Sequence, residues 1–370
     1  MLNSKNSASE ERATSSFSGP VFQDVLKKYQ LNHDTNYADH HDEEEDDQDG
    51  AISMAFFELA NAPEIAYRLS SSSSRSSSRQ PTADSTSITN NPGSHPETTT
   101  IHKEKSKNPD PDSPQQANDP FSDPHHNYVI LRQDNTNQQH TGGIVWETSF
   151  LLLTYLLNST KQQPPLVGNQ LVEVGAGMGL LGLVLALEGR CHTAILTDTD
   201  PVLALLANNV SRHEAMLKRR KARCTVCRLD WEHCERDIVD KDKDSPNHSQ
   251  PDESARLRPH SADTIVGTDV VFAPHLVRPL LQTCTRLAHD TTVMFLCLQQ
   301  RCATSYQLLI DICGPEFGWV VQDISQDVWD TVPECAWGEE LECHVLCFQR
   351  ESVETRKSHC TSQKRRRKQK

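Results

Sequence analysis

The chain has 370 residues, of which 35% are hydrophobic, and its mean hydropathy is -0.62. A chain packed throughout its length would hold about 45–50% apolar residues, so we expect one compact domain with disordered extensions. The 37 Lys and Arg against 51 Asp and Glu give a net charge of -14, which argues against nucleic-acid binding through global charge. No apolar run approaches the ~18 residues of a membrane span. The N-terminus lacks an apolar signal core, so we expect a non-secreted protein whose 12 cysteines are mostly reduced.

Residues 1–119 are expected to form a mostly disordered extension. An acidic run at residues 42–49 is typical of a solvated tail. The Ser-, Thr-, Pro- and Asn-rich stretch at residues 70–118 is typical of a flexible linker. Between them, residues 51–69 can form a short helix, broken near Pro63, that packs on the domain or docks a partner.

The patterned part of the chain spans residues 120–352, a length that suits a single domain. Its polar stretch at residues 237–261 is interpreted as a surface insertion. The basic tail at residues 353–370 is compatible with a nuclear address and equally with no such role. We therefore expect a cytoplasmic protein with a nuclear location left open, and a monomer by default.

Strand and helix signals alternate along the domain. The expected strands are residues 128–131, 170–174, 193–196, 224–229, 263–266, 292–298, 319–323 and 341–348. The expected helices are residues 147–157, 180–188, 201–212, 274–287 and 305–313. This alternation predicts an α/β fold in which a doubly wound, mostly parallel sheet carries helices on both faces. The ligand of such a sheet lies beyond the carboxyl ends of the strands.

A glycine-rich loop follows the strand at residues 170–174, where Gly175, Gly177 and Gly179 alternate before a helix begins. Glycine permits positive φ and a close approach of the backbone to a ligand. The helix N-terminus adds free N–H groups. The same loop also fits a dinucleotide pattern that ends at Gly182. Because the tight turn begins directly after the strand, we favour the GxGxG pattern and expect Gly182 to serve helix–sheet packing.

Side chains after the next two strands are candidates for holding a nucleoside. Asp198 lies 21 residues beyond Gly177 and can bind two ribose hydroxyls. This spacing does not separate NAD from S-adenosylmethionine. The nearby Asp200 is the alternative ribose ligand, or else a helix cap. Trp231 can cover an adenine face or simply pack at the sheet rim.

Cys224 and Cys227 form a CxxC pair close to His233 and Cys234, a set that could in principle hold zinc. The pair falls on a predicted strand, where residues three apart point to opposite faces. We therefore expect buried thiols and no metal site.

Together these residues resemble the family 16 type of seven-β-strand S-adenosylmethionine methyltransferases, which are mostly protein-lysine methyltransferases. The resemblance spans about residues 128–350. It is carried by four blocks in family order, at residues 142–147, 171–179, 196–198 with 229–231, and 266–272. It implies a class I methyltransferase (Rossmann-like) fold and S-adenosylmethionine as the cofactor.

The resemblance also implies cofactor contacts for residues of all four blocks. These are Trp146, Glu173, Gly175, Ala176, Gly177, Gly179, Asp198, Trp231 and Thr268. Within this set, Glu173 is expected near the methionine amino group, Asp198 on the ribose and Trp231 on the adenine. Thr268 stands where the relatives usually have Ala.

Asp269 and Phe272 match an acidic-x-x-aromatic motif that, by resemblance, faces the target lysine. Asp269 would orient the amine through a hydrogen bond and Phe272 would form a wall of the channel. The alternative for Asp269 is a helix N-cap or a carboxylate at the rim. Phe stands where Tyr is common, so no phenol hydroxyl is available at this position.

The expected activity is transfer of a methyl group from S-adenosylmethionine to a lysine amine of another protein. Three alternatives stay open at this point. The acceptor can be histidine or arginine, the domain can be a cofactor-binding interaction module without catalysis, or the glycine loop can serve an NAD(P) oxidoreductase. The sequence does not specify the substrate protein or the degree of methylation.

Overall fold

The computed structural model describes residues 19–28, 49–70, 128–136, 141–158, 168–239 and 257–350. The expected linker, the basic tail, most of the acidic run and the centre of the 237–261 insertion lie outside these residues. None of the described helices is long and apolar enough to cross a membrane.

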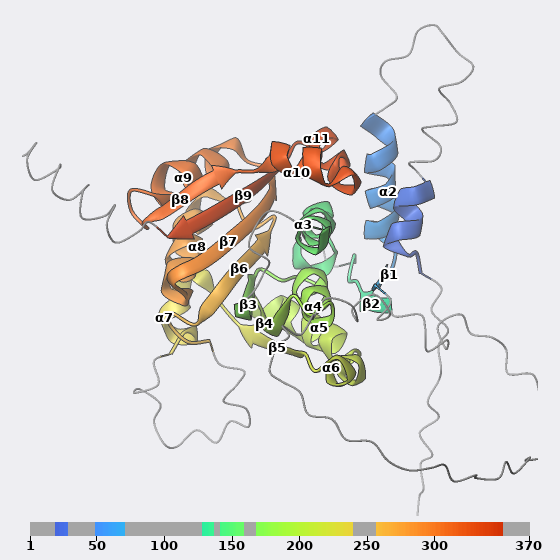
Figure 1. Cartoon of the computed structure of the whole chain (residues 1–370), viewed down its shortest axis with the longest axis horizontal. Helices are drawn as coiled ribbons and strands as arrows, with labels where there is room; N and C mark the ends of the chain where they lie inside the picture. Colours follow the sequence, from blue (N-terminus) through green and yellow to red (C-terminus); the bar gives the residue numbers. More distant parts are fainter. Residues whose placement is uncertain are drawn as a thin grey trace, which may run out of the picture.

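A seven-stranded sheet forms the centre of the fold (Figure 1). Its strands are β3 (Gly168–Val174), β4 (Cys191–Asp198), β5 (Arg223–Arg228), β6 (Ala262–Thr268), β7 (Ala288–Gln299), β8 (Trp319–Asp323) and β9 (Cys343–Arg350). Their spatial order is β5-β4-β3-β6-β7-β9-β8, and β9 runs antiparallel to the other six strands. This confirms the expected doubly wound α/β sheet of the class I type. The order reverses between β3 and β6, which is where such sheets bind their ligands.

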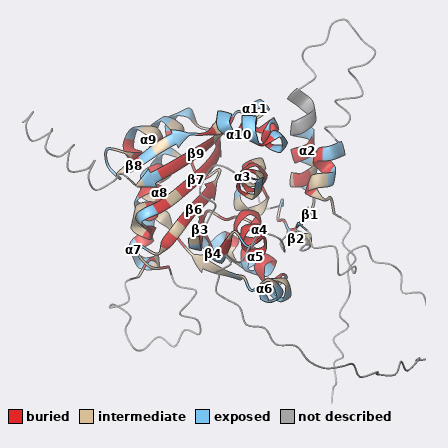
Figure 2. Cartoon of the chain, in the orientation of Figure 1, coloured by how far each residue is buried: buried red, intermediate tan, exposed pale blue. Residues whose placement is uncertain are grey.

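Helices cover both faces of the sheet (Figure 1). One layer contains α3 (Glu147–Asn158), α4 (Leu180–Leu187), α5 (Asp200–Ser211) and α6 (Glu214–Arg220). The other contains α7 (Cys234–Asp237), α8 (Pro274–Leu287) and α9 (Ala303–Cys313). Figure 2 shows the burial concentrated between these layers. Successive side chains of β3 alternate between them, because Leu171 packs with the first layer and Val172 with the second.

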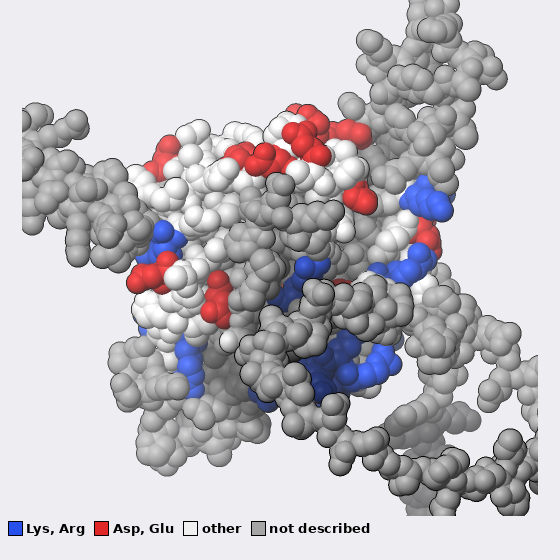
Figure 3. Space-filling model, viewed as in Figure 1, with Lys and Arg blue, Asp and Glu red and all other residues white. Residues whose placement is uncertain are grey.

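Four short α-helices within residues 168–350 were not expected from the sequence: α6, α7, α10 (Ser325–Thr331) and α11 (Trp337–Glu340). Each has at most seven residues, too few to show a clear helical period. Figure 3 shows acidic side chains over α10 and α11, and Lys and Arg side chains around α6.

The N-terminal part of the domain differs from expectation. The expected short helix is present as α2 (Asp49–Asn61) and ends just before Pro63, where a break was expected, but the residues beyond it form strand β1 (Glu64–Arg68). β1 pairs antiparallel with β2 (Tyr128–Arg132), so the first expected strand of the domain lies outside the seven-stranded sheet.

The domain therefore begins before residue 120. Phe22 stacks on Phe150 of α3, with ring centroids 3.8 Å apart, and Phe56 of α2 joins the same cluster. Composition alone does not show that the segments of Phe22 and Phe56 contribute to the core, because a long polar stretch of sequence separates them from the rest of the domain.

Candidate active site

A cavity of about 460 Å³ opens beyond the carboxyl ends of β3, β4 and β6. Of the expected site residues, those that line it are Trp146, Gly175, Ala176, Gly177, Asp198, Trp231, Thr268, Asp269 and Phe272. Residues from four separate blocks of the sequence thus meet at the switch point of the sheet. Two expected residues, Glu173 and Gly179, are not part of this lining.

The floor of the cavity is the backbone of the glycine loop. Gly175 and Gly177 adopt left-handed conformations, with φ of 65° and 53°. A Cβ added at Gly175 would lie 2.8 Å from Val270 Cγ1 and 3.4 Å from the Trp231 ring. Side chains are therefore excluded from this position by conformation and by space, which leaves the backbone open to a ligand.

Asp198 ends β4 beside this floor. Its Oδ2 accepts a hydrogen bond from the Gly177 N–H at 2.9 Å, and its Oδ1 accepts one from the Thr199 N–H at 2.8 Å. Burial raises the pKa of Asp198, and the two N–H donors act against that shift. Asp200, the alternative ribose ligand, pairs instead with Arg228 at 3.0 Å and does not line the cavity.

The structure corrects the expectation for Glu173. Its side chain leaves β3 on the side of α4 and is 2% exposed, and its Oε2 accepts a hydrogen bond from the Gly182 N–H at 2.9 Å. Burial raises the pKa of Glu173 to about 8, opposed by the Gly182 N–H and assisted by the charge of Asp198. The carboxylate therefore lies beneath the helix, away from any ligand in the cavity.

Gly179, at the end of the loop, and Gly182, inside α4, both serve packing. Gly179 precedes α4 with a φ of 83°, and a Cβ there would lie 2.6 Å from Leu206 Cδ1. The expectation that Gly179 contacts the cofactor is therefore replaced by a role in the turn. A Cβ at Gly182 would lie 2.2 Å from Leu196 Cδ2, which confirms the expected close helix–sheet approach.

Trp231 forms one wall of the cavity. It opens a short 3-10 helix, Trp231–His233, in which Asp230 accepts a hydrogen bond from the Glu232 N–H at 3.1 Å. The indole is partly buried against the core on the α8 side and lies beside Gly175. Trp231 therefore packs at the rim of the sheet and also presents a flat surface to the cavity.

Asp269 stands on the opposite side, directly after β6. Its φ is 52°, and its side chain is only 8% exposed. Its Oδ1 accepts a hydrogen bond from the Gln299 N–H at 3.0 Å, and its Oδ2 accepts one from Arg301 at 3.2 Å. Burial raises the pKa of Asp269, against the opposing charge of Arg301. Asp269 is not a helix N-cap, because α8 is preceded by Ala273 in that position.

Phe272 marks the mouth of the cavity. It is 44% exposed, which is unusual for a large apolar side chain, and it lies three residues beyond Asp269. A flat apolar surface at the entrance suits the aliphatic stem of an incoming side chain.

Arg301 is the main functional candidate that the sequence analysis missed. It follows β7 and donates a hydrogen bond to Glu147 Oε1 at 2.7 Å, in addition to its bond with Asp269. Its guanidinium carbon lies 4.5 Å from the centre of the Trp146 ring. The sequence does contain one signal for Arg301. It is the one Lys or Arg between residues 287 and 349, so it stands out as an isolated basic residue.

A hydroxyl pair was also missed. Ser149 Oγ lies 2.8 Å from Thr268 Oγ1, and both residues line the cavity between its two sides. Position 149 lies on α3, an apolar helix whose pattern gives no indication of a site residue.

The residues of the cavity fit S-adenosylmethionine. The bare backbone at Gly175–Gly177 can approach an amino-acid group, the carboxylate of Asp198 suits ribose hydroxyls, and the face of Trp231 suits a purine. Ile144 and Val202 add apolar surface.

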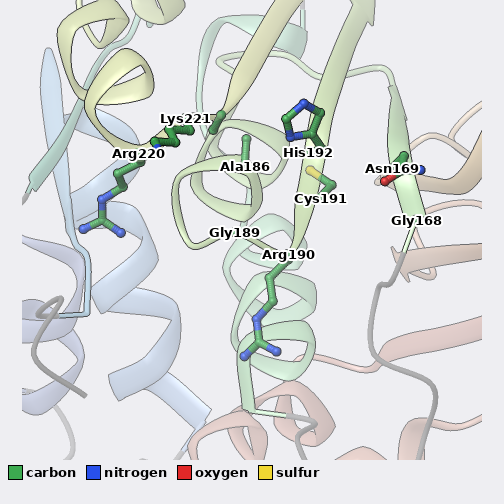
Figure 4. A pocket seen from close by; sticks show the side chains of 10 residues that line it. Gly168, Asn169, Ala186, Gly189, Arg190, Cys191, His192, Arg220 and Lys221 are labelled. Atoms are coloured by element: carbon green, nitrogen blue, oxygen red, sulfur yellow. The ribbon is translucent and has the colours of Figure 1, made fainter. Parts of the chain in front are cut away.

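A second cavity, of about 310 Å³, lies at the amino ends of β3 and β4 (Figure 4). Its arginines support the fold, because Arg190 donates to the carbonyl of Leu157 and Arg220 to that of Leu187 at 2.9 Å. Figure 4 shows both guanidinium groups directed away from His192. This cavity lies at the opposite end of the strands from the switch point, where doubly wound sheets bind their ligands.

The CxxC pair behaves as strand geometry predicts. Cys224 packs with the core on the α4 side and Cys227 with the core on the α8 side. Burial raises the pKa of both thiols, that of Cys227 to about 11. Among the described residues, no group of three or more His, Cys, Asp or Glu is placed to hold a metal ion.

Comparison with known proteins identifies the family. A family model described as lysine methyltransferase matches residues 125–245. The protein N-lysine methyltransferase METTL21A of Mus musculus is 31% identical over 175 residues, which cover 47% of this chain and 68% of that protein. The chain belongs to the lysine methyltransferase family. S-adenosylmethionine is the cofactor of this methyltransferase family.

Other relatives agree with this assignment. The protein N-lysine methyltransferase METTL21A of Danio rerio is 27% identical over 187 residues, covering 50% of this chain and 73% of that protein. The protein-lysine methyltransferase METTL21E of Mus musculus is 30% identical over 160 residues, covering 43% of this chain and 57% of that protein. The family resemblance seen in the four sequence blocks is thereby confirmed.

Proposed function

We propose that this chain transfers a methyl group from S-adenosylmethionine to the side-chain amine of a lysine in another protein. The observation that carries the proposal is the buried Asp269 carboxylate, which faces the same cavity as the glycine loop and has Phe272 at its mouth. The names of the relatives, which describe protein-lysine methyltransferases, support the same acceptor.

The donor side holds the cofactor mainly through the loop and Asp198. The backbone of Gly175, Ala176 and Gly177 lies against the methionine part, Asp198 binds the ribose hydroxyls, and Trp231 covers the adenine. Bound S-adenosylmethionine supplies an electrophilic methyl group. Trp146 and Thr268 line the space between this side and the acceptor.

The acceptor side positions the amine. A lysine enters past Phe272, whose ring packs against the aliphatic stem and excludes water. Asp269 accepts a hydrogen bond from the amine at Oδ2 and so directs the nitrogen lone pair toward the methyl group. The free amine has a pKa of about 10.4, so the ammonium must lose its proton to solvent before attack, and a partly desolvated channel makes that loss easier. The amine nitrogen then bonds to the methyl carbon as its bond to sulfur breaks, and S-adenosylhomocysteine leaves.

A transfer assay tests the proposal. The purified full chain is mixed with radiolabelled S-adenosylmethionine and a whole-cell protein extract, beside a Gly177→Arg variant that places a side chain on the cavity floor. We expect a discrete labelled protein with the native chain and none with the variant. Hydrolysis of the labelled protein should release methyl-lysine.

Other outcomes would overturn the proposal in distinct ways. Label on histidine or arginine would show that the chain is a methyltransferase whose acceptor is not lysine. Binding of S-adenosylmethionine by calorimetry without any labelled protein would indicate an interaction module that lacks transfer.

A further inference from the structure

The acceptor side of the cavity already contains a cation. Arg301 Nη2 lies 2.7 Å from Glu147 Oε1 and 3.2 Å from Asp269 Oδ2. The guanidinium carbon lies 4.5 Å from the centre of the Trp146 ring. Two carboxylates and an indole face are groups that bind cations in proteins.

The groups that surround the Arg301 guanidinium are fixed by hydrogen bonds or are more buried than Arg301 itself. Asp269 Oδ1 is held by the Gln299 N–H at 3.0 Å, and the Trp146 Nε1–H donates to the Thr141 carbonyl at 2.9 Å. The Asp269 and Glu147 side chains are 8% and 15% exposed, whereas that of Arg301 is 36% exposed. Arg301 thus reaches the buried carboxylates from a loop, on a long and partly solvated stem.

The net charge around Asp269 depends on Arg301. Glu147 faces it from α3, Arg301 from the loop after β7, and the thiols of Cys297 and Cys343 from β7 and β9. Burial raises the pKa of both thiols, so they stay neutral at physiological pH. Of these groups, Arg301 alone is positive.

We propose that Arg301 is a positioning residue that makes the site accept the target lysine as a neutral amine rather than as an ammonium ion. This inference rests on the proposed function. Two unpaired carboxylates would bind the ammonium and favour its charged form. By pairing with them, Arg301 removes that preference and fixes the Asp269 oxygen that receives the amine. The ammonium form, which lacks a lone pair, is then not trapped in the site.

A binding experiment tests this without any methyl transfer. The probe is n-butylammonium, which reproduces the end of a lysine side chain, and n-butanol is its neutral match. Binding is followed by NMR through the indole N–H of Trp146, assigned with a Trp146→Phe variant, on the full chain with S-adenosylhomocysteine present. We expect Arg301→Gln to bind n-butylammonium at least about tenfold more tightly than the native chain, with no gain for n-butanol.

Three further variants sharpen the result. Arg301→Lys keeps a cation in the site and should bind the probe as weakly as the native chain. Adding Asp269→Asn to Arg301→Gln removes one of the two carboxylates and should reduce the gain. Arg301→Met keeps the apolar stem against Trp146 and carries the same expectation as Arg301→Gln, should the latter fail to fold. Equal binding by the native chain and both uncharged variants would overturn the inference.

Kinetics provide the second readout, with the protein substrate that the transfer assay identifies. In Arg301→Gln we expect kcat and KM both to fall, and the kcat–pH profile to move upward by about one pH unit. A merely structural role would lower kcat without moving the pH profile. Failure of the proposed function shows as absence of methyl-lysine with the native chain, whereas failure of this inference shows as absence of a gain in n-butylammonium binding.

Discussion

The two sides of the cavity are built in different ways. The donor side consists of the backbone of Gly175–Gly177 and two side chains, Asp198 at the end of β4 and Trp231 shortly after β5. The acceptor side consists of a charged cluster in which Asp269, Glu147 and Arg301 come from three elements far apart in the chain. The donor side is therefore encoded by local motifs. On the acceptor side a local motif supplies Asp269 and Phe272, and tertiary packing adds Glu147 and Arg301.

This difference suggests how the two sides divide the work. The donor side offers shape and hydrogen bonds, which can bind a cofactor without any acceptor present. The acceptor side offers charge, which decides the protonation state and orientation of the incoming amine. Variants on the acceptor side should therefore leave cofactor binding nearly unchanged. Variants on the donor side should leave the protonation state and orientation of the amine nearly unchanged.

The largest separation is expected for Asp269→Asn. The amide is isosteric but no longer offers a charged oxygen to the amine or to Arg301. We expect kcat for methyl transfer to fall about 1000-fold, equivalent to about 4 kcal/mol. The affinity for S-adenosylmethionine, measured by calorimetry, should stay within about threefold of native. A parallel loss of cofactor affinity would show that the two sides are not separable.

The pH dependence of stability tests the corrected position of Glu173. Its pKa of about 8 in the fold lies above the ordinary 4.5, so the stability contributed by its neutral form is complete below about pH 4.5. That contribution is lost as the pH rises through about 8, because the ionised carboxylate is then buried. Between about pH 6 and about pH 9 the native chain should lose about 3 kcal/mol of unfolding free energy relative to Glu173→Gln.

Urea unfolding of both proteins across this pH range measures the difference, and calorimetry supplies the control. Glu173→Gln should bind S-adenosylmethionine as the native chain does, because the side chain lies beneath α4. A large loss of affinity for S-adenosylmethionine would show that the Glu173 side chain reaches the cofactor, and would contradict its position beneath α4.

Asp198→Ala is expected to affect the donor side alone. It removes a carboxylate that fixes the Gly177 N–H and faces the cavity. We expect S-adenosylmethionine to bind about 30-fold more weakly, equivalent to about 2 kcal/mol, because charged hydrogen bonds are worth about 1.5–3 kcal/mol each. Asp200→Ala is the matched control, because that carboxylate pairs with Arg228 outside the cavity. Equal losses in the two variants would argue against a specific role for Asp198.

The smallest expected effect concerns packing beneath the loop. In Gly182→Ala the added methyl group meets Leu196 Cδ2 at 2.2 Å and Glu173 Oε2 at 2.7 Å. We expect the unfolding free energy to fall by about 1.5 kcal/mol through overpacking. Gly314→Ala is the control, because its closest contact is 3.3 Å, to the Trp319 carbonyl, and its φ is -77°. Thermal unfolding of both variants distinguishes a steric effect at Gly182 from a general cost of replacing glycine.

The donor side could be predicted because its signals are local. A strand, a glycine turn and a helix follow one another within Gly168–Leu187, and the backbone geometry of the turn depends on those residues themselves. The seven-stranded sheet followed from the same alternation. Glu173 was placed wrongly because its direction depends on which side of the sheet α4 covers, which is a tertiary fact.

Other features could not be predicted for related reasons. Arg301 acquires its role only when β7 brings it beside Glu147 of α3, more than a hundred residues away in the chain. The packing of Phe22 and Phe56 on α3 likewise depends on contacts across a long polar stretch. Hydrophobic period and turn chemistry report local structure and give no information about such contacts.

The most direct test of the central claim is mass-spectrometric identification of the residue that gains the methyl group. The native chain, Asp198→Ala and Asp269→Asn are each incubated with S-adenosylmethionine and the protein substrate. We predict methylation of a lysine by the native chain, with Asp269→Asn inactive although it still binds the cofactor. Methylation of any other residue type, or native-like lysine methylation by Asp269→Asn, would contradict the account.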